Sequence, residues 1–516
     1  ITDQQRKDHL SCYNNKSILK TPNINKIAKE GIKFSKFYCT NPICMPNRST
    51  IFTGEYPSVH GVTTNGRNLP HDTRTFANIL SENDYYTASF GKIHLNYFGG
   101  YIRGLFDNPH TSQEFTLPQD YPKLTNYSPY FGLSETKIVS GHGTLTGHPD
   151  YQEWMMEKLR TDEVLQSKLK IKPDATDKDL EKAIKRCFHI KVKESFVGLQ
   201  VWKHKIPEEL YTTTFVKDNT IQFLERFANG NYSQKNFLAI ASFPDPHAPF
   251  TPPGKYFDMY KPEDIILPET FNNTHEKSSQ FMRDHFMHTK KTEGTNDKDF
   301  PLAIELTEIE AKRVIAAMYG MEKMIDDAVG EILNALDKLG LAENTIIIYT
   351  TDHGELGGDH RFFFKGPFLY QGLINIPFLI KIPNSSQKGE THSLAASIDI
   401  PETILELAGI SIPKSMQGKS LTPILLNNNE KIKDEIYIEM DDDFQEEKTR
   451  TLVTDEWRIT IYNDFGEMYN LKKDPNEKNN LWNDEFFKDI KLDLILRLYR
   501  KSIRNIEKKV IRDCEY

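Results

Sequence analysis

Two strand-like runs with a long helix between them constrain the fold of this chain most. Residues 236–243 (Asn-Phe-Leu-Ala-Ile-Ala-Ser-Phe) form an apolar run of strand length, and residues 345–350 (Thr-Ile-Ile-Ile-Tyr-Thr) have the β-branched composition of a strand buried on both faces. Between them, apolar residues recur at spacings of three and four from about residue 308 to Gly340, after a capping box of Thr307 and Glu310. Strands that alternate with helices predict an α/β fold with a large, mostly parallel sheet flanked by helices.

Charged and imidazole side chains follow directly after the expected strands. In open parallel sheets, ligands bind beyond the carboxyl ends of the strands. We therefore expect these side chains to meet at one edge of the sheet and to form an active site. They are Asp3 after residues 1–2, Lys92 and His94 after residues 86–90, His247 after residues 236–243, and Asp352 and His353 after residues 345–350.

The chain of 516 residues is long enough for one large domain and a smaller one. We expect residues 1–425 to form the large α/β domain and residues 426–516 a small C-terminal domain. After residue 431 the pattern changes to short alternating runs separated by turn residues, which predicts an antiparallel sheet followed by a helix near 484–508. The runs span residues 435–440, 449–454, 457–462 and 467–471.

Residues 100–210 are read as an insertion in the large domain. The segment has charged helical stretches near 151–170 and 176–188 and no motif. It either covers the site or makes an oligomer contact in a homo-oligomer. A solvated helical excursion explains the same pattern equally well.

The composition excludes several classes of function. A net charge of −8 gives no support for a nucleic-acid surface. Five cysteines are too few and too scattered for a disulfide framework. No apolar run approaches membrane-spanning length, so no membrane partner is expected. The sequence begins at Ile1 without a methionine, which leaves a cytoplasmic and a periplasmic location both open.

A cysteine motif lies at Cys44-Met45-Pro46-Asn47-Arg48. If Pro46 opens a helix, Cys44 lies at the positive end of that helix. Arg48 then lies on the same face and can reach an anion held at the helix start. The motif alone fits two interpretations equally: a nucleophile at an oxyanion site, or a small buried cysteine beside an ordinary surface arginine.

A second signature is Thr351-Asp352-His353-Gly354-Glu355. Together with Asp3 and Gln4, Asp352 and His353 supply three oxygens and one nitrogen, which is a ligand set for a divalent cation once an oxygen of the nucleophile joins it. An isolated Asp-His pair is more often part of a surface loop. Its combination with the cysteine motif favours a metal site.

The cysteine motif, extended by Thr53-Gly54 and by residues 56–62, resembles the modification motif of type I sulfatases of the alkaline phosphatase superfamily. The order Asp-Gln, Cys-x-Pro-x-Arg, Lys-x-His, Pro-x-His, Asp-His, Lys matches that family along nearly the whole chain, and residues 474–481 resemble its C-terminal subdomain. The resemblance implies that a formylglycine-generating enzyme oxidises Cys44, and that the hydrated aldehyde attacks sulfur and later expels sulfate. Asn47 departs from the family, which often has Ser or Ala there.

The resemblance also implies a role for each site residue. The metal, Ca²⁺ or Mn²⁺, would be bound by Asp3, Gln4, Asp352, His353 and modified Cys44. The cations Arg48, Lys92 and Lys365 would bind the oxygens of the transferring group, His94 would hydrogen-bond the formylglycine diol, and His247 would protonate the leaving alcohol or hold the sulfate. Asn65 matches a substrate-contacting asparagine, although a turn residue before glycine fits equally well. His60, His142 and His148 are assigned structural roles, and Asp359 and His360 are left unassigned.

The Asp352-His353 pair places the resemblance in the branch that includes choline sulfatases and phosphonate monoester hydrolases. Those hydrolases tend to have Tyr and Thr where this chain has Lys92 and His94, so the predicted reaction is hydrolysis of aryl or alkyl sulfate monoesters by a catalytic domain at residues 1–425. One alternative is phosphonate monoester or phosphodiester hydrolysis at the same site, with crossover activity expected. Another is a catalytically silent sulfatase-like binding protein.

Overall fold

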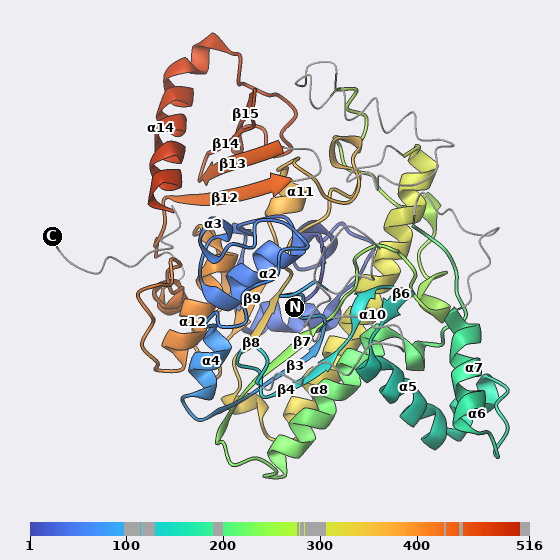
Figure 1. Cartoon of the computed structure of the whole chain (residues 1–516). Coiled ribbons are helices and arrows are strands. Elements are labelled where there is room, and N and C mark those ends of the chain that lie inside the picture. Colours follow the sequence, from blue (N-terminus) through green and yellow to red (C-terminus); the bar gives the residue numbers. More distant parts are fainter. Residues whose placement is uncertain are drawn as a thin grey trace.

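The computed structural model describes residues 1–97, 114, 129–188, 200–275, 278, 283, 306–427, 430–442 and 447–505. Its centre is a twisted sheet with helices on both faces (Figure 1). Among the described residues, no helix combines the length and the apolar character needed to cross a bilayer.

The first two residues of the chain join two groups of strands into this central sheet. One group is parallel and has the order β4 (Glu135–Ile138), β3 (Tyr85–Gly91), β7 (Asn236–Ser242). The other has the order β8 (Ile347–Thr350), β9 (Phe378–Lys381), β1 (Ile32–Phe34), β10 (Gly389–Thr391). Ile1 forms backbone hydrogen bonds with Ala241 in β7 and with Phe243 directly after it, and Thr2 forms a parallel bridge to Thr351 after β8.

The expected α/β class is confirmed, and the sheet is mixed rather than purely parallel. Strand β9 runs antiparallel to both β8 and β1, whereas β1 and β10 are parallel. Strand β8 is fully buried only at Tyr349 and Thr350, because Ile347 and Ile348 at its other end are only partly covered. The strand ends that carry the predicted site therefore lie in the most buried part of the sheet.

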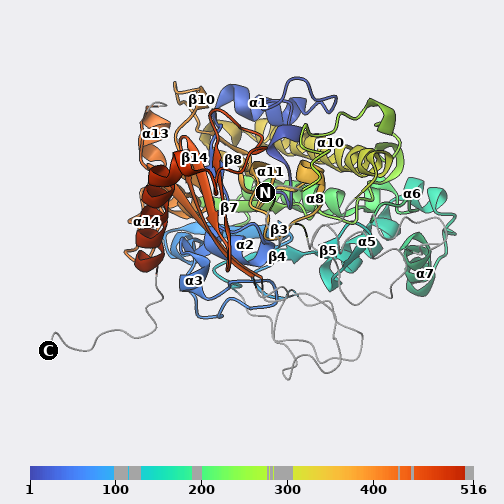
Figure 2. The same cartoon turned by 90° about the horizontal axis from the view of Figure 1, so that it is seen from above.

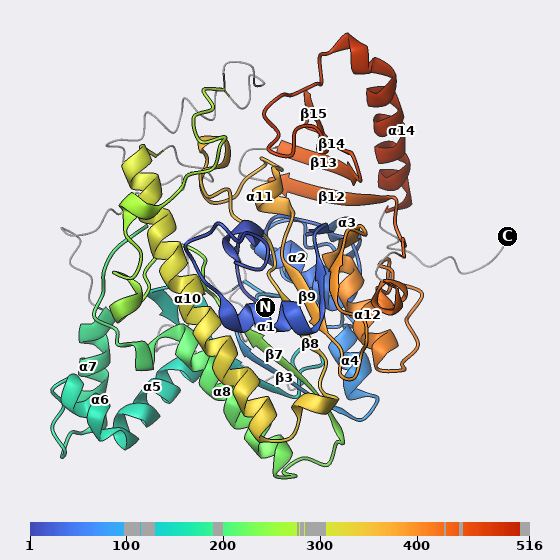
Figure 3. The ribbon, with the colours of Figure 1, turned by 180° about the vertical axis from the view of Figure 1, so that it is seen from behind.

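Helices cover the two faces of the central sheet, as Figures 2 and 3 show. On one face lie α1 (Pro22–Glu30), α8 (Thr212–Ala228) and α10 (Glu308–Lys338), which share one core with the strands. On the other lie α2 (Cys44–Thr53), α4 (Phe76–Ser81) and α12 (Ile400–Leu407). The capping box of Thr307 and Glu310 is present at the start of α10, as expected. The shorter elements are β2 (Phe37–Tyr38), β11 (Ala395–Ala396), α3 (Pro57–His60), α11 (Gln371–Ile374) and α13 (Thr422–Leu426).

The expected insertion contributes to the central sheet as well as to its surroundings. Strand β4 falls within residues 100–210 and pairs with β3. The hairpin β5 (Ser140–His142) and β6 (Leu145–Gly147) follows it, and then come α5 (Pro149–Thr161), α6 (Glu163–Lys168) and α7 (Asp177–Phe188), close to the expected helices. Residues 98–113, 115–128 and 189–199 of this region lie outside the described residues.

The C-terminal part contains the expected antiparallel sheet. Strands β12 (Glu435–Asp442), β13 (Glu447–Thr454), β14 (Trp457–Ile461) and β15 (Gly466–Asn470) pair in sequence order. Helix α14 (Lys488–Arg504) packs on this sheet through Leu494 and Leu498. The boundary at residue 425 stays a prediction, since the sheet also contacts the α2 region, where Asn41 Nδ2 donates to the Glu439 carbonyl at 2.7 Å.

Candidate active site

Cys44 is the first residue of helix α2. Ile43 before it has an extended backbone, and Gly54 ends the helix in the left-handed conformation with φ 70°. Pro46 therefore lies third in the helix and does not open it, and its missing N–H costs nothing because first-turn N–H groups have no intrahelical acceptor. Every residue of α2 is buried. Cys44 is thus held at the positive end of a buried helix, as expected.

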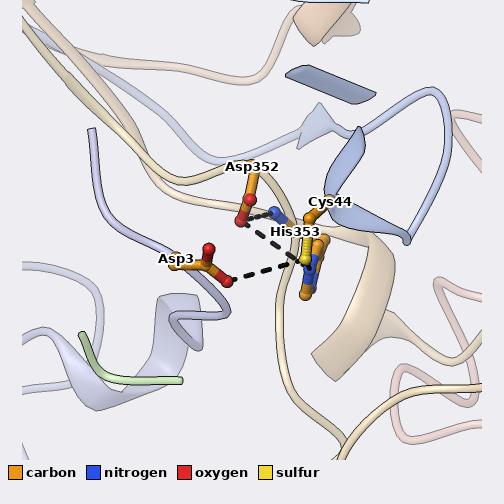
Figure 4. A group of neighbouring side chains, drawn as sticks. All are labelled: Asp3, Cys44, Asp352 and His353. Atoms are coloured by element: carbon orange, nitrogen blue, oxygen red, sulfur yellow. Dashed lines mark hydrogen bonds and ion pairs between the residues drawn. The ribbon is translucent and has the colours of Figure 1, made fainter. Parts of the chain in front are cut away.

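Cys44, Asp3, Asp352 and His353 meet beyond the strand ends (Figure 4). One donor atom from each of them lies within 4.8 Å of the others, and all four residues are buried. The Cys44 sulfur is 3.1 Å from His353 Nε2 and 3.8 Å from Asp3 Oδ1. The parallel bridge between Thr2 and Thr351 explains this, because it sets the next residue of each segment, Asp3 and Asp352, side by side.

Gln4 contributes its side-chain amide oxygen to this group. Its backbone is left-handed, with φ 61°, and its N–H donates to Asp352 Oδ1 at 3.1 Å. Its Nε2 donates to the buried Glu355 carboxylate, so its Oε1 is the atom that remains for a ligand. That Oε1 is buried and has no hydrogen-bond partner among the described residues. Two carboxylates, an amide oxygen and an imidazole are a donor set that fits a divalent cation.

Arg48 contacts the carboxylates more closely than the sequence suggested. Its Nε donates to Asp352 Oδ2 at 2.7 Å, and its two terminal nitrogens reach the Lys92 carbonyl at 2.8 Å and Asp3 Oδ2 at 3.4 Å. Burial would lower the pKa of Arg48, but Asp352 and Asp3 raise it. The guanidinium therefore holds the two acidic candidate ligands in place.

The charge of Asp3 is stabilised although the residue is buried. Burial and the Cys44 sulfur act to raise the pKa of Asp3, but Lys92, His247 and Arg48 outweigh them and lower it to about 2. Asp3 is therefore an anion at neutral pH, as a metal ligand must be.

Lys365 reaches the Cys44 sulfur directly. Its Nζ lies 2.9 Å from Sγ, 3.1 Å from His247 Nε2 and 3.2 Å from His353 Nε2. Burial would raise the pKa of the Cys44 thiol, but Lys365, Lys92 and His353 lower it well below its usual range. An anionic atom at this position is thus strongly stabilised, and the same holds for negative charge on a bound ligand.

Lys92 and His94 extend from the end of β3. The Lys92 ammonium contacts the Asp3 carboxylate and lies 2.7 Å from His142 Nε2. His94 is buried in a left-handed conformation with φ 59°. Burial, and next the charge of Lys92, lower the pKa of His94 to about 3, although a hydrogen bond with Cys44 opposes this. His94 is therefore a neutral imidazole beside Cys44.

His247 directs one ring nitrogen toward the site. Its Nδ1 is bonded to the Ala248 carbonyl, which places the proton on Nδ1. Its Nε2, 3.1 Å from the Lys365 Nζ, then accepts a hydrogen bond. Burial and Lys365 lower the pKa of His247.

His142 lies in the site although the sequence assigned it a structural role. Its ring stacks on His247, with centroids 3.6 Å apart and planes at 11°. It comes from the β5–β6 hairpin, in the part of the chain that carries no motif, so no strand-end signal marked it. A second residue without a signal is Glu114, whose buried carboxylate accepts the N–H groups of His94, Leu95 and Asn96.

Asn47 and Asn65 have supporting contacts. Asn47 is buried and joins α2 to its surroundings: its Oδ1 accepts from Thr40 N at 3.1 Å and Ser397 Oγ at 2.6 Å, and its Nδ2 donates to the Asp352 carbonyl. Asn65 is exposed, and its Oδ1 accepts from Met45 N at the start of α2 at 3.0 Å. A substrate contact of Asn65 stays a prediction.

The remaining histidines named from the sequence make local contacts. The two ring nitrogens of His60 bond Thr50 Oγ1 and Val62 N, each at 3.1 Å, and His148 Nδ1 accepts from Asp150 N at the start of α5. His360 stacks on Tyr370, and Asp359 forms an ion pair with Arg6 at 2.9 Å.

Comparison with known proteins gives the family. Residues 1–410 match the family described as Sulfatase, and residues 358–504 match the one described as N-sulphoglucosamine sulphohydrolase, C-terminal. An arylsulfatase of Clostridium perfringens is 29% identical over 516 residues, which cover 98% of this chain and 94% of the relative.

Solved structures share the fold. The phosphonate monoester hydrolase of Agrobacterium radiobacter has a TM-score of 0.75 at 21% identity, and the match covers 98% of this chain and 94% of that one. A protein solved in complex with its substrate D-glucosamine-2-N,6-O-disulfate has a TM-score of 0.68 at 20% identity, with 98% and 97% covered.

The fold described above is the alkaline phosphatase-like fold of these structural neighbours. The match over residues 1–410 shows that the chain belongs to the sulfatase family, and it is a sulfuric ester hydrolase. The family uses a metal and formylglycine, and the donor group around Cys44 is a site able to hold a metal.

Proposed function

We propose that this chain hydrolyses aryl or alkyl sulfate monoesters with a formylglycine made from Cys44 by a formylglycine-generating enzyme. The observation that carries the proposal is the position of Cys44 at the buried start of α2, 2.9 Å from Lys365 and 3.1 Å from His353. In the unmodified chain the Cys44 sulfur stands in for the formylglycine oxygens, which would meet the same cations. Formylglycine supplies a geminal diol, of which one hydroxyl can attack sulfur and the other can later lose its proton.

Asp3, Gln4, Asp352 and His353 would hold the metal, together with modified Cys44. A bound divalent cation would polarise the sulfate and lower the pKa of the attacking hydroxyl. The orphaned Gln4 Oε1 and the ionised Asp3 support this set. The imidazole of His353 admits Mn²⁺ or a similar ion beside Ca²⁺.

The remaining residues would bind the sulfate and move protons. Lys365 contacts Cys44 and Lys92 contacts the neighbouring Asp3 carboxylate, so both place positive charge near Cys44, where the non-bridging oxygens of a sulfate would lie. His94, which is neutral, can accept a proton from the diol. His247 Nε2 would first take a proton from the Lys365 ammonium, 3.1 Å away, and pass it to the leaving alcohol, while Nδ1–H stays anchored on the Ala248 carbonyl.

A phosphonate monoester hydrolase is the rival assignment, and the Asp352-His353 pair is the feature that favours it. Lys92 and His94 favour the sulfatase, because a sulfate monoester offers three non-bridging oxygens to these donors. A diester instead brings a second carbon substituent into the same space.

Two measurements test the proposal. Conversion of cysteine to formylglycine lowers the intact mass by about 18 Da, so mass spectrometry of the chain reads the modification directly. Fully modified protein with defined metal is then assayed on aryl sulfates, alkyl sulfates, sulfated sugars, a phosphonate monoester and a phosphodiester. Preference for sulfate esters supports the assignment. Faster turnover of diesters would move it to the rival branch, and a modified protein inactive on the whole panel would overturn it.

A further inference from the structure

We propose that His142, from the β5–β6 hairpin, is a positioning residue that directs Lys92 and His247 toward the sulfate. The inference rests on the proposed function and names a residue outside the strand ends. Two contacts carry it: the 2.7 Å hydrogen bond between Lys92 Nζ and His142 Nε2, and the stacking of His142 on His247 at 3.6 Å.

The first contact sets the direction of the Lys92 ammonium. An ammonium has three N–H groups in a tetrahedral arrangement and no acceptor. One N–H is directed to the Asp3 carboxylate and another to His142 Nε2, so the direction of the third is determined. Without His142 the flexible lysine stem could rotate about its bond to Asp3. His142 thereby selects one ammonium orientation beside Cys44.

The second contact fixes the tilt of the His247 ring. The bond from Nδ1 to the Ala248 carbonyl restrains one edge of that ring, but it permits tilting about this edge. The nearly parallel His142 ring covers one face of His247 and prevents the tilt. The two contacts of His142 therefore orient both the Lys92 ammonium and the His247 Nε2 that faces Lys365 at 3.1 Å.

The hairpin that carries His142 is itself firmly held. Thr144 N donates to Thr251 Oγ1 at 3.2 Å, and Trp202 Nε1 donates to Thr144 Oγ1 at 3.0 Å. Gly143 has φ 51°, and a Cβ there would lie 2.5 Å from the Pro249 carbonyl oxygen. The turn of the hairpin thus packs on the backbone that follows His247. The hairpin and the His247 loop form one unit.

Two substitutions separate the contacts. His142→Phe keeps an aromatic ring for stacking but removes the acceptor, and His142→Gln keeps an acceptor oxygen but removes the ring. Losing one charged hydrogen bond should lower kcat/KM on an aryl sulfate about tenfold or more for His142→Phe. The control is Leu145→Ala, which lies opposite His142 in the hairpin, is 59% exposed, and should keep wild-type kinetics.

A double-mutant cycle with Lys92→Ala tests whether His142 acts through Lys92. If it does, His142→Phe should add little to the loss caused by Lys92→Ala, because the partner of the contact is already gone. Full additivity, or wild-type kinetics of His142→Phe, would overturn the inference.

A second readout does not need turnover. Calorimetric titration of the purified protein with inorganic sulfate should show a Kd about tenfold weaker for His142→Phe than for wild type and for Leu145→Ala. An inactive wild type would overturn the proposed function, whereas an active wild type with equal Kd and kinetics in His142→Phe would overturn only the role of His142.

A separate observation concerns the outer face of helix α14, and from it we infer a second contact surface. Leu492, Leu496, Tyr499 and Ile503 recur at spacings of four, three and four and are 56%, 45%, 63% and 48% exposed. The opposite face of α14 packs on the C-terminal sheet, and the helix lies at the outer edge of the molecule (Figures 1 and 2). Such a stripe has the spacing of a helix–helix seam.

The charges beside the stripe identify its partner as a second copy of this chain. On one side of the stripe, Asp489 and Asp493 accompany its first half, and Arg500 and Arg504 its second half. Neither arginine forms an ion pair with another described residue. When two copies pair antiparallel about a twofold axis, the acidic half of each helix faces the basic half of the other. In a parallel pair this side of the stripe would face the opposite side of the partner's stripe, so its acidic and basic halves would not meet.

Charge reversal provides the test of this dimer. By analytical ultracentrifugation, the wild type should reach twice the chain mass of 59.7 kDa as concentration rises. The Asp489→Arg/Asp493→Arg and Arg500→Asp/Arg504→Asp proteins should each remain monomeric, whereas an equimolar mixture of the two should form a heterodimer. The control is Ile266→Asp. Ile266 lies outside α14 and is 77% exposed, so this substitution should leave the dimer intact. A wild type that stays monomeric would overturn the inference. A dimer that is insensitive to both charge reversals would overturn it as well.

Discussion

Arg48, beside Cys44, and Arg458, in the C-terminal sheet, are both buried arginines that lie between two carboxylates. Arg458 is bonded to Glu477 and Glu467, donates to Thr460 Oγ1 at 2.7 Å, and lies 4.7 Å from the ring centroid of Tyr469. The side chains that surround the two arginines are of similar kinds. The two clusters differ in the other hydrogen bonds that the neighbours of each arginine form.

Around Arg458, both carboxylates accept further hydrogen bonds from neighbouring groups of the protein. Glu477 also accepts from Gln371 N at 2.8 Å, and Glu467 accepts from the hydroxyls of Tyr462 and Tyr469 at 3.2 and 3.3 Å. Around Arg48 the contacts converge on one point, where Lys365, His247 and His353 meet the Cys44 sulfur and Gln4 Oε1 has no partner among the described residues. Buried charge is thus structural where its partners satisfy it completely, and indicates function where several groups share one open position.

The largest expected effect is that of Cys44→Ala. It should lower kcat on sulfate esters about ten-thousandfold or more, because the nucleophile is lost. The free energy of unfolding should change little, since the charges around Arg48 still balance. Steady-state kinetics and denaturant unfolding check the two parts. Wild-type kcat in this variant would refute the mechanism.

Metal removal comes next. Chelation should abolish activity, and Asp352→Ala should lower the metal bound per chain, because a carboxylate ligand is lost. It also leaves the Arg48 guanidinium without its 2.7 Å partner, so the melting temperature should fall, in contrast to Cys44→Ala. Elemental analysis and calorimetry measure both. Full metal content in Asp352→Ala would remove this residue from the ligand set.

Arg458→Met should show the opposite pattern to Cys44→Ala. It leaves Glu467 and Glu477 buried without their cation, which should cost about 3–5 kcal/mol in the free energy of unfolding. The kcat of the protein that remains folded should stay at the wild-type value. Urea unfolding together with active-site titration tests this. A stable but inactive variant would mean that the two clusters are coupled.

Lys92→Ala tests whether one cation of the active site selects sulfate esters over phosphodiesters. Loss of one charged contact in a desolvated site should cost roughly 2–4 kcal/mol in transition-state stabilisation. We expect about a hundredfold lower kcat/KM on sulfate esters and a distinctly smaller loss on phosphodiesters. Both substrate classes are measured on both proteins. Equal losses would show that Lys92 supports the site generally and does not select sulfate.

The smallest effect concerns Glu402, a buried acid beside another acid. Burial, and next the Asp399 carboxylate, raise the pKa of Glu402 to about 8. Above a pH of about 4.5 the unfolded chain loses this proton while the folded chain retains it, so stability should fall as pH rises toward 8. Glu402→Gln should reduce the difference in melting temperature between pH 5.5 and pH 8. An unchanged difference would place the pH dependence elsewhere.

The sequence by itself determined the features that depend on neighbours along the chain. The start of α10 follows from the Thr307–Glu310 capping box, and the position of Cys44 at a helix start follows from the residues around Pro46. The convergence at the sheet edge could also be predicted, because the side chains after Thr2 and Thr351 follow strand ends and parallel strands end at one edge.

Tertiary structure alone decided the contacts between distant segments. His142 joins the site through a hairpin whose two strands pair with each other, and Glu114 binds the backbone at His94 from a segment with no motif. Asn47 departs from the family pattern, yet it ties α2 to the Asp352 carbonyl across more than 300 residues of sequence. Local patterns encode which element a residue occupies. They do not encode which donor meets which acceptor, because that depends on how the sheet, the hairpin and the loops pack together.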